Sequence, residues 1–61
     1  MTNFFVWGEY GVHADDWVGE KRRALSAENA RRNFIRDLKK EQPMLWERIG
    51  EHNVYVREGD D

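Results

Sequence analysis

The segment from Ala27 to Lys40 constrains the fold of this chain most, because its apolar residues recur with the period of an α-helix. Ser26, just before it, is a favourable N-cap, and Glu28 falls in the first turn, where the helix dipole favours negative charge. We therefore predict a helix over residues 27–40. Ala27, Ala30, Phe34 and Leu38 lie along one apolar face, and we assign its Ala30, Phe34 and Leu38 side to the core.

Three other segments are rich in the aromatic and β-branched residues that favour strands, namely Asn3–Tyr10, Trp17–Leu25 and Asn53–Arg57. Gly11–Asp16 is predicted to be the turn between the first two. In the second strand, Gly19 suggests a bulge, and the three consecutive bases at 21–23 suggest an exposed edge strand.

Pro43–Ile49 is predicted to be a short second helix, with proline in its first turn and Gly50 as its terminator. The order of elements, β-β-α-β with the short helix before the last strand, predicts an α+β fold. One main helix would pack on one face of a small antiparallel sheet. The 61 residues fit a single domain over 1–61, and residues 58–61 are expected to be a frayed acidic tail.

The chain contains no cysteine, which excludes disulfides, cysteine-ligated metals and thiol chemistry. We expect no membrane segment, since no apolar run approaches the length that crosses a bilayer. The N-terminal residues lack the positive region of a signal peptide. These features favour a cytoplasmic protein.

Signals for catalysis are poor, and we expect no enzyme, no cofactor and no metal. The only hydroxyl nucleophiles are Thr2 at the terminus and Ser26, which is needed as the helix cap. The glycines fit no phosphate-binding loop. The two histidines, His13 and His52, have acidic neighbours but not the spacing of a ligand set.

The charge is unevenly distributed along the chain. Residues 1–20 carry four acids and no base, residues 21–40 eight bases and two acids, and residues 41–61 two bases and six acids. One interpretation is that the acidic ends fold beside the basic helix and neutralise it; the other is that the helix presents a basic contact surface. The second interpretation selects four residues of the helix: Arg32, Arg36, Lys39 and Lys40.

A second candidate surface is aromatic. One helix covers only one face of a sheet, so if Phe4 and Val6 face the helix, the rings of alternate residues point away from it. Those rings belong to Phe5, Trp7 and Tyr55. Either the segment 43–50 folds over them, or they remain exposed as a protein-binding surface.

These surfaces favour a small non-enzymatic protein that binds another protein, acting as an adaptor or as an inhibitor that occludes its partner, or one that forms a homodimer. By analogy with other very small proteins, a phage or mobile element is a plausible source. The alternative is a nucleic-acid-binding module that uses the basic helix face over residues 31–40. The acidic overall balance of the chain argues against that alternative.

Overall fold

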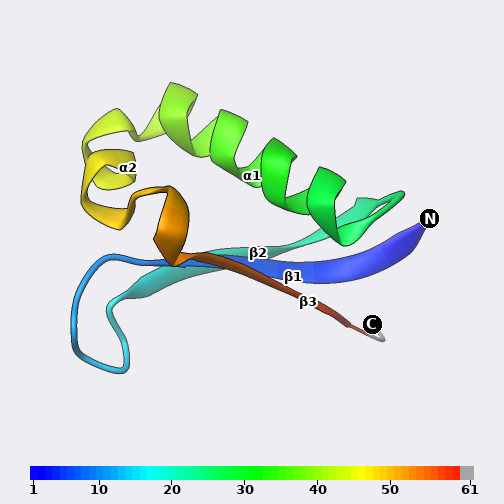
Figure 1. Cartoon of the computed structure of the whole chain (residues 1–61), viewed down its shortest axis with the longest axis horizontal. Coiled ribbons are helices and arrows are strands. Elements are labelled where there is room, and N and C mark those ends of the chain that lie inside the picture. The colour runs from blue at the N-terminus through cyan, green and yellow to red at the C-terminus, as the bar shows by residue number, and fades with distance from the viewer. Residues whose placement is uncertain (60–61) are drawn as a thin grey trace.

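A computed structural model describes residues 1–59 of the chain. Three antiparallel strands form one sheet in the order β2-β1-β3, with β1 (Thr2–Glu9) in the centre between β2 (Trp17–Ala24) and β3 (Val54–Glu58). The two helices, α1 (Ala27–Glu41) and α2 (Pro43–Ile49), both lie on one side of the sheet (Figure 1). This arrangement confirms the predicted α+β fold.

Helix α1 begins as predicted, with Ser26 as its N-cap. The Ser26 hydroxyl accepts a hydrogen bond from the backbone N–H of Asn29 at 3.1 Å, which satisfies one of the free donors of the first turn. The side of α1 that faces the sheet carries Ala30, Phe34 and Leu38, and all three are buried. They meet the inward residues of the sheet in one core, which consists of Phe4, Val6, Ala24, Ala30, Phe34, Leu38, Ile49 and Val54.

The short helix α2 continues this helical layer rather than crossing to the other side of the sheet. Its Ile49 is buried, and Leu45 and Trp46 pack against the core. Gly8 on β1 leaves the space for Ile49, because a Cβ on Gly8 would lie only 2.9 Å from the Ile49 Cδ1 atom. The segment 43–50 therefore does not cover the outward rings of the sheet.

Two details of the predicted strands were wrong. Gly19 forms no bulge, since the pairing of β1 with β2 runs without interruption from Thr2↔Ala24 to Glu9↔Trp17. Asn53 belongs to a 3₁₀ turn (Glu51–Asn53) that precedes β3, where its side chain donates to the Ile49 carbonyl. Of the predicted tail, Glu58 lies within β3 and Gly59 donates its N–H to the Asn3 carbonyl; the rest of that tail lies outside the described residues.

Arg22 connects β2 to α1 and is turned inward. Its guanidinium forms ion pairs with Asp37 of α1 at 2.8 Å and with Glu20 at 3.2 Å, and it lies 6.0 Å from the centre of the Phe34 ring. The prediction that β2 is an edge strand is confirmed, but Arg22 is only 19% exposed and is not a free surface cation.

The contact between Arg22 and Asp37 makes the stability of the fold depend on pH. The hydrogen bond from Arg22 holds the pKa of Asp37 below its usual value of 3.8, with Arg36 adding to the effect and burial opposing it. The ionised carboxylate thus stabilises the folded chain at pH above that usual value, and the contribution is lost as pH falls through the folded-state pKa. We expect Asp37→Asn to flatten this part of the pH dependence of the unfolding free energy, measured with urea. Glu47→Gln, at an exposed site, should leave it unchanged.

Candidate interaction surface

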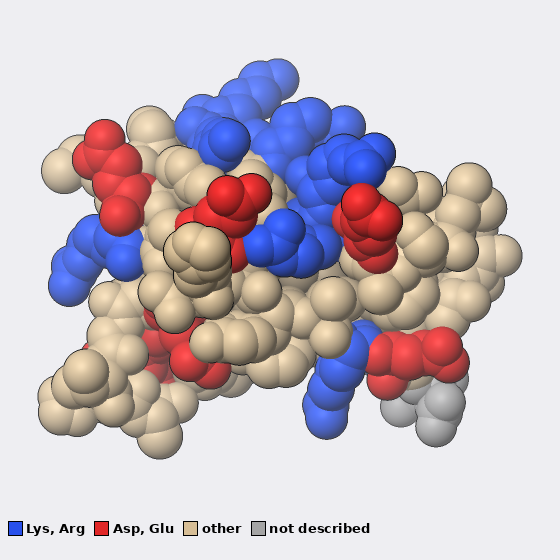
Figure 2. Space-filling view, viewed as in Figure 1, with Lys and Arg blue, Asp and Glu red and all other residues tan. Residues whose placement is uncertain are grey.

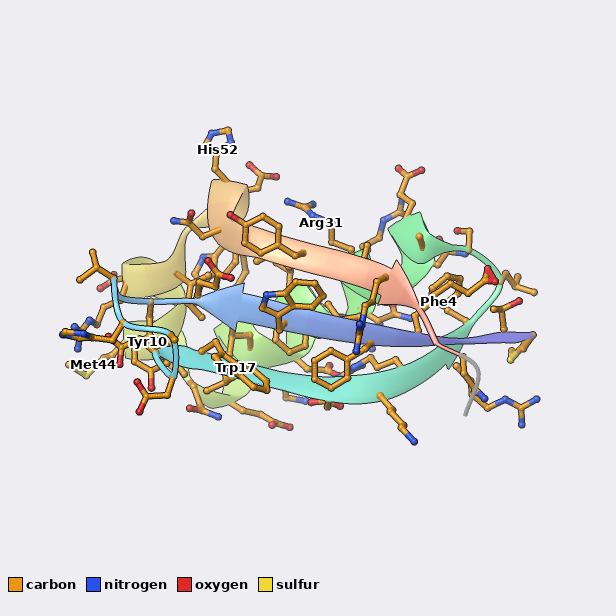
Figure 3. All side chains as sticks on the ribbon, turned by 90° about the horizontal axis from the view of Figure 1, so that it is seen from below. Phe4, Tyr10, Trp17, Arg31, Met44 and His52 are labelled. Atoms are coloured by element: carbon orange, nitrogen blue, oxygen red, sulfur yellow. The ribbon has the colours of Figure 1, made fainter. Side chains whose placement is uncertain are left out.

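The sheet has one face without a helix, here called the open face. The strand register places on it every second residue of each strand, beginning with Asn3 of β1, and the opposite phase faces the core. The side chains of the open face are those of Asn3, Phe5, Trp7 and Glu9 on β1, Trp17, Lys21 and Arg23 on β2, and Tyr55 and Arg57 on β3. Figure 3 looks onto this face, with Trp17 on the near side of β2.

The centre of the open face is a cluster of four aromatic rings in mutual contact. Trp7 and Tyr55 are stacked with their ring centres 5.5 Å apart, and Phe5 is tilted against Trp7 at 5.9 Å. Trp17 meets Phe5 edge to face, also at 5.9 Å. Trp17 and Tyr55 remain 43% and 40% exposed, so the cluster presents a broad aromatic surface rather than a closed core.

Gly19 makes this cluster possible. A Cβ at Gly19 would lie 2.7 Å from the Cβ of Trp7 and 3.1 Å from the Phe5 ring. The missing side chain opens a gap on β2 between Trp17 and Lys21, and the neighbouring rings lean into it. The absence of a side chain at Gly19 therefore makes room for the rings, while the strand pairing through it stays regular.

A shallow hollow of about 370 Å³ lies beside the rings. The loop after β1 forms one of its walls: this loop is closed by a hydrogen bond from the Tyr10 N–H to the Asp16 carbonyl, and it projects beyond the sheet on the side away from the helices (Figure 1). The hollow combines aromatic, acidic and basic groups, with Phe5, Trp7, Glu9, Ala14, Trp17 and Arg57 lining it.

Three cations accompany the rings. Lys21 and Arg57 flank Phe5 on the two neighbouring strands, and the Arg57 guanidinium lies 5.9 Å from the Phe5 ring centre. Arg23 lies one step further along β2, opposite Asn3. None of these cations was among the residues predicted for the protein-binding surface, and neither was Trp17. Alternation along 17–23 could have placed Trp17, Lys21 and Arg23 on one phase, and alternation along β3 places Arg57 with Tyr55. Only the register shows that these phases form the open face.

The structure brings the three predicted aromatic residues together but keeps the predicted basic residues apart from them. Arg32, Arg36, Lys39 and Lys40 all belong to α1, on the other side of the sheet, and are exposed. Figure 2 shows lysine and arginine side chains gathered over α1. The two sets therefore form two separate surfaces, not one.

Within the described residues, the acidic ends of the chain form no ion pair with the cations of α1. Arg32 pairs with Glu28 and Arg36 with Asp37, both acids of α1 itself. The Lys39 ammonium lies 5.1 Å over the Trp46 ring, and Arg31 donates to the Glu51 carbonyl at 2.6 Å. Within residues 1–59, Glu20 is the only acid outside α1 that forms an ion pair. Because the pairs of Arg32 and Arg36 are solvent-exposed, they neutralise the face weakly.

Neither a metal centre nor a membrane span is apparent in the described part of the chain. Residues 1–59 contain no cluster of three or more side chains suited to holding a metal ion. None of their helices has the length and apolar character needed to cross a bilayer.

Fold and surface together define a small α+β protein whose three-stranded sheet is covered by helices on one side and presents aromatic rings on the other. Comparison with protein-family models, with curated proteins and with solved structures finds no match to this chain.

Proposed function

We propose that this protein is a non-enzymatic, protein-binding protein, an adaptor or an inhibitor, that occupies its partner with the open face of its sheet. The observation that carries the proposal is the group of four contacting rings that neither helix covers. Tryptophan and tyrosine contribute most to protein interfaces because they bury a large area at a low entropic cost.

The open face supports this role better than the basic face of α1 does. It combines rings with Arg57 and with a hollow that a partner side chain can enter, whereas no large apolar side chain of α1 is exposed among its cations. Binding energy at interfaces concentrates in a desolvated apolar centre, while charges at the rim mainly steer association. The α1 cations are therefore assigned a secondary, steering contribution.

Single-stranded nucleic acid is the second candidate for the open face. Lys21, Arg23 and Arg57 stand beside rings on which unpaired bases could stack. The alternative drawn from the sequence instead placed the basic contacts on the helix face over residues 31–40. The acidic overall charge and the acid Glu9 beside the rings favour a protein partner.

The test compares the wild-type protein with two matched double variants. Trp7→Ala/Tyr55→Ala removes the stacked pair, and Arg32→Ala/Arg36→Ala removes two exposed cations of α1. Tagged proteins are used to capture partners from a nuclease-treated lysate of the native host, and the captured partner is then titrated in purified form. We expect the aromatic variant to lose at least about thirtyfold in affinity, as hot-spot truncation does, and the helix variant only a few-fold.

The same three proteins are titrated against labelled single-stranded DNA and RNA oligonucleotides at low salt, with fluorescence anisotropy as the readout. Affinity that disappears in the aromatic variant and falls steeply with salt would assign the face to nucleic acid instead. Partner binding that is unaffected by Trp7→Ala/Tyr55→Ala, with thermal unfolding showing that the variant folds, would refute the role of the open face.

A further inference from the structure

The open face carries charges of opposite sign at its two ends, with the rings between them. Lys21, Arg23 and Arg57 lie toward the end where β1 begins, here called the basic end. The other end, here called the acidic end, has Glu9 at the end of β1 and then Asp15 and Asp16 in the projecting loop. Two copies of such a surface are complementary in charge when one copy is rotated by half a turn relative to the other.

Among residues 1–59, no ion pair involves these charges of the open face. Within residues 1–59, the ion pairs are formed by Arg22, Arg32 and Arg36, which lie on the helical side. At the acidic end, Glu9 accepts only the indole N–H of Trp7, and the Asp16 carboxylate the backbone N–H of His13. As far as the described residues go, both ends of the open face thus keep their charge available to a partner.

We propose that the partner of the open face is a second copy of this chain. The two copies would face each other about a twofold axis through the aromatic cluster, with their β1 strands antiparallel. The basic end of one copy then lies against the acidic end of the other, and twofold symmetry repeats the contact. This inference rests on the proposed function, since it names the protein that the aromatic surface binds.

The shape of the molecule agrees with this arrangement. The loop carrying Asp15 and Asp16 projects on the open side at one end of the sheet (Figure 1). In the antiparallel arrangement, this loop extends past the end of the partner sheet, toward its Arg23. If the strands instead ran parallel, the two loops would meet each other and bring like charges together, which costs affinity.

The size of the face indicates how strongly the copies associate. Three strands of up to eight residues give a face of about 14 Å by about 26 Å, from the usual strand spacing and rise. That is smaller than the roughly 800 Å² that each partner contributes to a standard interface. We therefore expect a reversible dimer with a dissociation constant in the micromolar range, which a tighter-binding partner could displace.

The experiment is a charge swap followed by sedimentation equilibrium. Lys21→Glu/Arg57→Glu makes both ends of the face acidic, and Glu9→Lys/Asp15→Lys makes both ends basic. We expect wild-type protein to dimerise between about 10 and about 300 µM, and each variant alone to dissociate at least about tenfold more readily. An equimolar mixture of the two variants should recover dimers, because the acidic face of one variant then meets the basic face of the other.

Arg32→Glu/Arg36→Glu serves as the matched control, with the same change of charge on α1; it should dimerise like the wild type. Circular dichroism of every variant establishes that the fold is intact. A wild-type protein that stays monomeric at the highest concentration, or charge-swap variants whose mixture gains nothing over the separate proteins, would overturn the inference. A monomer would still leave the proposed function standing if Trp7→Ala/Tyr55→Ala abolishes capture of a different protein.

Discussion

Phe34→Ala is expected to remove about a third or more of the unfolding free energy of the protein. Phe34 is 4% exposed, in the middle of the face of α1 that meets the sheet. Truncation of a buried phenylalanine to alanine costs about 3–5 kcal/mol. A chain of this length has a total unfolding free energy of only about 3–9 kcal/mol at the usual stability per residue. The substitution also removes the ring against which the Arg22 guanidinium lies.

The measurement is urea unfolding followed by far-ultraviolet circular dichroism. Arg32→Ala is the control on the same helix, because this side chain is 69% exposed and pairs only with Glu28 of the preceding turn. The control should change the unfolding free energy by less than about 0.5 kcal/mol, as exposed substitutions do. A Phe34→Ala protein with a cooperative transition within about 1 kcal/mol of the wild type would contradict the assignment of Phe34 to the centre of the core.

Gly8→Ala is expected to destabilise the protein although it adds a single methyl group. The new Cβ would lie 2.9 Å from the Ile49 Cδ1 atom and 3.0 Å from its Cγ2 atom. Ile49 is 1% exposed, so it has little room to move away without displacing α2. Overpacking of this kind costs about 1–3 kcal/mol, which would lower the melting temperature of a small domain by roughly 5–20 °C.

A double-mutant cycle with Ile49→Val separates this clash from other effects of the alanine. Ile49→Val deletes the Cδ1 atom and alone should cost about 0.5–1.5 kcal/mol. Together with Gly8→Ala it should cost at least about 0.5 kcal/mol less than the two separate changes, because the deleted methyl makes room for the added one. Strictly additive costs in thermal and urea unfolding would show that Gly8 and Ile49 do not compete for the same space.

The elements whose residues follow one clear period could be predicted from the sequence. Ala30, Phe34 and Leu38 predict the buried face of α1, and Ser26 predicts the start of that helix. Proline and glycine mark the ends of α2 at Pro43 and Gly50. These features depend on residues close together in the chain, so local geometry and capping determine them.

The open face could be predicted only in part. Phe5 and Trp7 were placed on one phase of β1 correctly, because alternation within a strand is local. Gly19 was misinterpreted as a bulge and Trp17 was not recognised as part of the cluster, because the role of each depends on the strand that it pairs with. Arg22 was counted as a surface cation, since the sequence does not show that Asp37 and Phe34 lie over it.

By itself, then, the sequence determined the elements, the apolar face of α1 and the two phases of β1. The tertiary structure decided the rest: that α2 joins α1 instead of covering the rings, that Lys21 and Arg57 flank Phe5, and that the open face is basic at one end and acidic at the other. The physical reason is the separation along the chain of the residues that interact. Helical and strand periods come from neighbours along the chain, whereas the composition of a face depends on strand register and packing between residues far apart in the sequence.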